Sequence, residues 1–342
     1  MREVNRNMLI LARESRGMTQ ADLAERMGTT QGNIGKMERN ENGVSDEWLN
    51  SLSEATHYPV SFFTQEGGMM PENINYRKRE NVAQSLIIPV NAKVNILRLH
   101  IQEITRQLKL ELPDMPSFEV NEKSSPASIA NKLRKLWELD HKPVNNLTEV
   151  LEGKGILVST FDFGTERIDS KCILTEDKFP VIFLNNTLLG DRQRFSLAFQ
   201  LAHIVLHTYS KVDRQRDTTH EANLFAAEFL MPEKPISIDF KQGVSIGLLG
   251  ELKQKWKVSM ISLLYRADDL GFLTTYQKNT LIKQFNELQI RRREPVELDV
   301  PIEKPKLMKQ LLAQYKSSLK LDVADLASKL HLQTDEFIQL YN

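Results

Sequence analysis

Two stretches decide the fold of this chain: residues 191–207 read DRQRFSLAFQLAHIVLH, and residues 220–232 read HEANLFAAEFLMP. Both are largely apolar and long enough for helices, so each predicts a helix that packs inside a domain. Short apolar runs at 155–160, 171–174 and 180–185 come before them and predict three strands of a small sheet. We therefore expect an α+β domain in the middle of the chain.

The first of these helices has the spacing of a metal-binding motif without its side chains. Zinc peptidases carry His-Glu-x-x-His on one helix, where both histidines bind the ion and the glutamate activates its water. Here Phe199 and Gln200 stand at the first ligand and the base, followed by His203 as the second ligand. Phenylalanine has no donor atom, and an amide is no base. With Glu221 from the second helix, two ligands remain where a catalytic zinc needs three, so we expect no catalytic residue, no metal and no cofactor.

Two alternatives stay open for the remaining histidines. His203 and His207 are four residues apart, so with Glu221 they would form a displaced zinc site, although Ile204 stands where its base would lie. We favour a buried His203 that is hydrogen-bonded to Glu221 without metal, with Phe199 filling the vacated ligand space. A pocket left there would be a candidate sensor site.

The head of the chain, residues 1–66, carries a second pattern. Residues 17–38 read GMTQADLAERMGTTQGNIGKME. Thr19 and Thr30 each precede a short run of apolar residues at helical spacing, which is the place of a helix cap. Gly28 lies between these runs and allows a tight turn with positive φ.

This pattern resembles the Xre (Cro-repressor-like) family of helix-turn-helix proteins, through Thr19-Gln20, Leu23-Ala24, Gly28, Ile34 and Glu38. The resemblance implies double-stranded DNA as the partner, with Gln20 and Thr30 on phosphates. It places Gln31, Asn33 and Lys36 in the major groove. The alternative is a small helical bundle without a DNA role. The head has seven basic residues against ten acidic ones, so we expect its DNA affinity to depend on a homodimer and on low salt.

Residues 67–123 are expected to be a linker and a connector helix. Gly67 and Gly68 indicate a flexible joint, and the basic segment 76–79 is either a source of positive charge for DNA or a solvated face. A helix beginning at Pro89 is predicted, with the heptad positions Val90, Val94, Leu97, Ile101, Ile104 and Leu108. Such a seam would zip two subunits together or pack on a core, and we favour the core because Ile96 and Leu99 widen it.

Residues 124–270 resemble the ImmA/IrrE metallopeptidase family. The residues that carry the resemblance are Asn185, Arg192-x-Arg194-Phe195, the helix with His203, Glu221-Ala222-Asn223 and Leu230-Met231-Pro232. The family also pairs this domain with an Xre head. The resemblance places Phe199 at the family's first histidine and Gln200 at its general base. It places His203 at the family's second histidine and Glu221 at its glutamate ligand, which implies a pseudoenzyme.

Residues 271–342 are expected to form a helical C-terminal region. Residues 322–331 echo residues 21–28, but His331 replaces the glycine, and Asp335 and Glu336 would be repelled by phosphate. We therefore expect a helical hairpin for packing or partner contact rather than a second DNA reader.

Composition adds limits on location and partners. The 45 basic and 45 acidic residues cancel, so nucleic-acid binding is argued from the motif alone. Cys172 is the single cysteine, and no apolar run approaches the roughly 18 residues of a membrane span. These features favour a cytoplasmic protein, and the two resemblances imply that it is bacterial or phage-encoded and nucleoid-associated.

The expected fold is mainly α with a small β-sheet. The expected function is that of a transcriptional regulator whose inactive peptidase-like domain binds a small-molecule effector or a partner protein such as a cognate toxin. The alternative is an active zinc metallopeptidase that cleaves a repressor protein.

Overall fold

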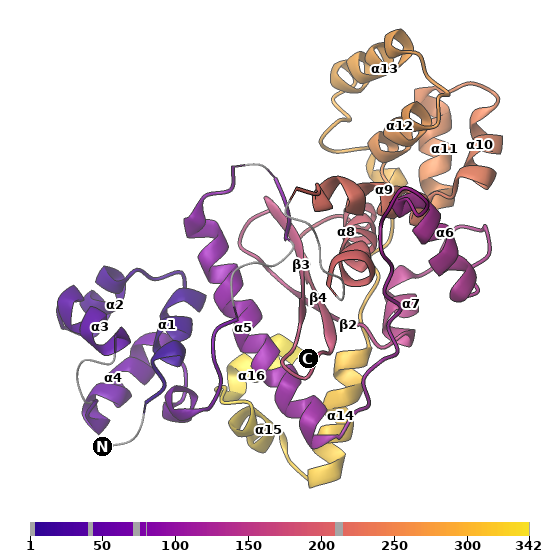
Figure 1. Ribbon diagram of the computed structural model, residues 1–342. Coiled ribbons are helices and arrows are strands. Elements are labelled where there is room, and N and C mark those ends of the chain that lie inside the picture. Colours follow the sequence, from indigo (N-terminus) through magenta and orange to yellow (C-terminus); the bar gives the residue numbers. More distant parts are fainter. Residues whose placement is uncertain (1–3, 40–43, 71–75, 80, 209–214, 342) are drawn as a thin grey trace.

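The computed structural model describes residues 4–39, 44–70, 76–79, 81–208 and 215–341 (Figure 1). The head and connector contain α1 (Arg6–Ser15), α2 (Gln20–Arg26), α3 (Gln31–Glu38), α4 (Asp46–Thr56), η1 (Val60–Thr64), β1 (Tyr76–Lys78) and α5 (Gln84–Gln107). The central part contains α6 (Pro126–Leu136), α7 (Leu147–Gly153), β2 (Leu157–Phe161), β3 (Ile168–Leu174), β4 (Pro180–Asn185), α8 (Gly190–Ala202), η2 (His203–Thr208) and α9 (Thr218–Leu230). The remaining elements are α10 (Glu233–Phe240), α11 (Ile246–Trp256), α12 (Met260–Asp269), α13 (Thr275–Glu287), η3 (Val296–Leu298), α14 (Leu307–Leu319), α15 (Val323–Lys329) and α16 (Thr334–Tyr341).

The sheet has four strands in the order β1-β3-β4-β2. The pairs β1–β3 and β3–β4 are antiparallel, and β2–β4 is parallel. The three predicted strands correspond to β2, β3 and β4. The fourth, β1, comes from the basic segment of the connector, where no strand was predicted.

Two hydrophobic cores lie on opposite faces of this sheet. Leu157, Val181 and Phe183 belong to the core that also contains the head, α5 and the tail helices α14 to α16. Their neighbours Val158 and Ile182 point the other way, into the core with α6 to α9 and α11 to α13. Alternation along a strand sends successive side chains to opposite faces, so a single sheet supports both cores (Figure 1).

The head folds as its capping residues predict. Thr19 and Thr30 accept hydrogen bonds from the backbone N–H groups of Asp22 and Asn33, and Asp22 completes a capping box. Gly28 has φ +62°, so the turn between α2 and α3 uses the left-handed conformation expected there. Together α1 to α4 form the mainly helical head at the left of Figure 1.

Besides the strand β1, the start of the connector helix differs from its prediction. Helix α5 begins at Gln84 rather than at Pro89, which lies inside it. Pro89 lies beyond the first four residues of the helix, whose N–H groups have no intrahelical acceptor, so its missing N–H costs α5 one hydrogen bond. The early start of the helix is accompanied by burial of Ile87 and Val90. Gly67 is also closely packed, because a Cβ on it would lie 2.7 Å from Leu99 Cδ2 on α5.

The heptad seam of α5 is buried within this chain. Val90, Val94, Leu97, Ile101 and Ile104 are all at most 4% exposed. They belong to the core shared with the head and tail, so the predicted packing on a globular core is confirmed, and the seam is not exposed for a coiled coil.

The tail forms the expected helical hairpin. Asp322 caps α15 in a capping box with Asp325, as Thr19 caps α2. His331 itself adopts φ +53° at the turn, where the head has a glycine. Within the described residues no helix is long and apolar enough to cross a membrane.

Candidate functional sites in the head and the peptidase-like domain

The predicted recognition helix α3 has the required two-sided character. Ile34 is 1% exposed and anchors the helix in the head, while Gln31, Asn33 and Lys36 are exposed. Thr30 is also exposed, and Gln20 is half-buried. The structure thus leaves four of the five predicted DNA-contacting residues exposed, and the fifth, Gln20, lies beside Gln31.

A polar network behind α3 orients two of these side chains. The Glu38 carboxylate accepts hydrogen bonds from Arg13 Nε at 2.6 Å and from Gln20 Nε2 at 2.8 Å. Gln31 Nε2 in turn donates to Gln20 Oε1 at 3.4 Å. Glu38 therefore fixes Gln20, and Gln20 positions the amide of Gln31 at the start of α3.

The second site lies where α8 and α9 pack together behind β3. Phe199 is 1% exposed and Gln200 is fully buried, so both point into the domain rather than into solvent. The Phe199 ring lies edge-on to the His203 ring, with centroids 4.8 Å apart. Gln200 Nε2 donates to Ser170 Oγ on β3 at 2.8 Å, while its Oε1 has no hydrogen-bond partner among the described residues.

The prediction of a hydrogen bond between His203 and Glu221 is wrong. His207 lies between them: its Nδ1 is 2.8 Å from His203 Nδ1, and its Nε2 is 2.9 Å from Glu221 Oε2. The predicted helix over 191–207 is also interrupted, because residues His203–Thr208 form the π-helical turn η2. Its wider winding changes the positions of residues 203 to 208 from those of an uninterrupted α-helix, and the α-helical prediction did not include it.

The charges of this group follow from burial and hydrogen bonding. Burial, and to a smaller extent the neighbouring His207, lower the pKa of His203 to about 3, so His203 is neutral. Burial also lowers the pKa of His207, against the opposing effect of Glu221. Burial would raise the pKa of Glu221, but hydrogen bonds from Arg216 and His207 outweigh it and lower this pKa. The arrangement is a neutral His203–His207 pair leading to a Glu221 carboxylate that is held by Arg216 Nε and Nη2.

The donor atoms of this group do not fit a zinc ion. The two ring nitrogens of His207 face different partners, His203 and Glu221, so His203, His207 and Glu221 do not direct three donors at one point. Over the ranges that the structure describes, no group of three or more His, Cys, Asp or Glu side chains is placed to hold a metal ion.

A cleft of about 600 Å³ lies beside Phe199. It is lined by β1 together with Arg79, Asp169, Arg192, Phe199, Thr219 and Asn223. Asp169 is 5% exposed and accepts hydrogen bonds from Arg77 and from Arg192. Sequence reasoning missed this cluster because Arg77 and Asp169 are 92 positions apart and a strand of three residues shows no periodicity.

Two segments of the chain match known protein families. Residues 9–63 match the helix-turn-helix family model, and residues 151–268 match the peptidase M78 model, described as an IrrE N-terminal-like domain. No curated protein matches the chain. The protein therefore combines an Xre-like helix-turn-helix domain with an IrrE/ImmA-like domain of the M78 peptidase family.

Proposed function

We propose that this protein is a sequence-specific DNA-binding transcriptional regulator whose peptidase-like domain does not cleave peptides. The helix-turn-helix match and the exposed polar face of α3 support the DNA-binding part. The observation that carries the loss of catalysis is the pair Phe199 and Gln200, buried in the last turn of α8 just before His203.

The chemistry of these two side chains supports the proposal. A peptidase zinc needs three protein ligands and an open position for water, and Phe199 offers no donor atom. Gln200 cannot take a proton from a bound water, and its amide is already bonded to Ser170. The loss of the ligand and the loss of the base each remove a group that the reaction needs, and either loss alone lowers the rate by orders of magnitude.

Zinc content tests the catalytic half of the proposal. Purified wild-type protein is expected to hold far less than one zinc per chain and to leave peptides intact. The double variant Phe199→His with Gln200→Glu is expected to bind zinc if the scaffold still accepts the ligand set. The matched control is Phe195→His with Gln200→Glu, which places the new histidine one helical turn earlier. Stoichiometric zinc in the wild type that is lost in His203→Ala or Glu221→Ala would instead establish the alternative, an active metallopeptidase.

DNA selection followed by titration tests the other half. The wild type first selects duplexes from a random pool. The double variant Gln31→Ala plus Lys36→Ala is expected to bind these duplexes at least tenfold more weakly, since one good base contact contributes about 1–3 kcal/mol. The matched control is Lys283→Ala plus Gln284→Ala, which removes the same two residue types from the exposed side of α13. Equal binding by both double variants, or no selected sequence, would refute the recognition helix.

A domain that has lost cleavage retains a binding role in this proposal. Its occupant is a partner protein such as a cognate toxin, or a small-molecule effector that changes DNA affinity, acting on a homodimer. A protein that co-purifies in fixed ratio favours the first, and a metabolite that releases DNA from the isolated protein favours the second.

A further inference from the structure

The edge of the sheet next to Phe199 is covered by the connector. Strand β1 pairs antiparallel with β3 in the register Tyr76↔Lys171, Arg77↔Ser170 and Lys78↔Ile168. The Arg79 N–H extends this pairing by donating to the Arg167 carbonyl at 2.9 Å. An exposed strand edge offers unpaired N–H and C=O groups to any extended peptide, and here a segment of the same chain takes that position.

Arg77 is held in the cleft by several kinds of contact. Its Nη1 donates to Asp169 Oδ2 at 2.7 Å and to Ser196 Oγ on α8 at 2.8 Å. Its guanidinium lies over the Phe195 ring, 4.8 Å from the centroid, and 5.8 Å from that of Phe199. An acidic group beside aromatic faces is an environment selective for arginine, because the planar cation both pairs and stacks.

Tyr76 is recognised as specifically as Arg77. Its hydroxyl donates to Asn91 Oδ1 on α5 and accepts from Lys171 Nζ at 3.2 Å. The Lys171 ammonium also lies 4.5 Å from the centroid of the Tyr76 ring. Backbone pairing at a sheet edge, combined with specific sites for neighbouring side chains, is how proteins bind extended peptides by strand addition.

We propose that the β3 edge and its cleft form a docking site for an extended segment of a partner protein with an aromatic residue followed by arginine, which displaces β1. The proposal rests on the proposed function, in which the cleft binds without cutting. Two features make β1 replaceable: its register with β3 shifts between Arg77 and Lys78, and Lys78 is exposed.

A labelled peptide with the sequence of residues 74–81, INYRKREN, tests the site in trans by fluorescence anisotropy with the full chain. Arg77→Ala removes the anchor of the internal competitor and leaves Asp169 paired with Arg192, so the protein is expected to fold. This variant should bind the peptide at least tenfold more tightly than the wild type. The matched control Arg6→Ala, an exposed arginine on α1 outside the cleft, should bind as the wild type does.

Two further measurements keep the outcome decisive. Two changes should each abolish the gain. The first is Asp169→Ala in the Arg77→Ala background, and the second is a peptide in which alanine replaces the arginine that corresponds to Arg77. In wild-type protein, excess unlabelled peptide should increase amide exchange at residues 76–79 and leave β3 protected. Equal binding by Arg77→Ala and Arg6→Ala with both folded, or unchanged exchange at residues 76–79, would overturn the docking site. Cleavage of the bound peptide, read by mass spectrometry, would overturn the proposed function and leave the docking site standing.

Discussion

At the scale of single residues, the peptidase-like domain contains a buried lysine that pairs with two carboxylates. Lys253 on α11 donates to Asp191 Oδ2 at 2.5 Å and to Glu294 Oε2 at 2.6 Å, and all three side chains are at most 7% exposed. Burial alone would lower the pKa of Lys253, but the two carboxylates outweigh burial and raise it. Asp191 stands at the start of α8, so this charge cluster fixes the helix that carries Phe199 and His203.

Lys253→Met should destabilise the protein by about 3–5 kcal/mol, because it leaves two buried carboxylates without a cation. The matched control is Lys255→Met two residues later, whose ammonium is 48% exposed and pairs with Asp239. That substitution is expected to cost about 1 kcal/mol or less. Urea unfolding of both variants measures the difference, and equal midpoints would show that the cluster contributes no more than a surface ion pair.

At the scale of elements, helix boundaries followed the sequence where a local side chain decides them. Thr19 and Thr30 were predicted as caps and make the expected hydrogen bonds. The end of α14 is less favourable, because Lys320 follows it with φ +53°, a conformation that costs a residue with a Cβ about 1 kcal/mol. Its side chain is exposed.

Lys320→Gly is therefore expected to raise the free energy of unfolding by about 0.5–1 kcal/mol, with the greater freedom of glycine in the unfolded chain offsetting part of the gain. Gln314→Gly in the exposed interior of the same helix should lower it by about 1 kcal/mol. Thermal unfolding distinguishes the two substitutions. A loss of stability in both would mean that the positive φ at Lys320 carries no strain.

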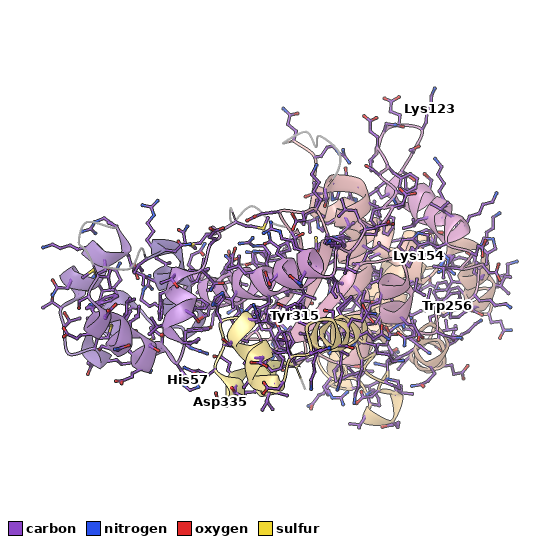
Figure 2. The ribbon with its side chains drawn as sticks, turned by 90° about the horizontal axis from the view of Figure 1, so that it is seen from below. His57, Lys123, Lys154, Trp256, Tyr315 and Asp335 are labelled. Atoms are coloured by element: carbon purple, nitrogen blue, oxygen red, sulfur yellow. The ribbon has the colours of Figure 1, made fainter. Side chains whose placement is uncertain are left out.

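At the scale of the whole molecule, the head is joined to the tail by side chains far apart in sequence. Arg16 Nη1 and Nη2 donate to the two carboxylate oxygens of Glu336 at 2.7 and 2.8 Å, and the Arg16 guanidinium lies 4.2 Å from the centroid of the Tyr58 ring. His57 at the end of α4 lies 3.0 Å from Asp335 (Figure 2). The sequence predicted a packing or partner role for the tail hairpin, and within this chain it packs against the head.

Glu336→Ala should loosen this junction, because it removes both hydrogen bonds to a partly buried guanidinium. We expect faster amide exchange in α1 and α4 and a loss of about 1 kcal/mol in stability, since both side chains of the pair remain partly exposed. Asp335→Ala is the control: its carboxylate is 73% exposed, and exchange in the head should stay unchanged. Identical exchange in the two variants would contradict a specific role for Glu336.

The sequence predicted local and periodic features and missed those made by distant pairs. Three strands, the caps and the exposed face of α3 follow from residues a few positions apart. The partner of His203 was mispredicted because the π-helical turn and the tautomers depend on tertiary packing. The cluster of Lys253, Asp191 and Glu294, and the pairing of β1 with β3, join segments separated by tens of residues, so no local pattern announces them. For α5, the same apolar stripe suits a dimer seam and an internal core, and only the structure distinguishes them.

The core shared by the head, α5 and the tail has a consequence for how the protein is made. The first helices emerge from the ribosome early, but Leu311, Tyr315 and Leu326, which belong to the same core, are synthesised much later. A chain that is still being translated would therefore carry a head without its full support. Packing of the head would be complete only after α14 to α16 have been translated.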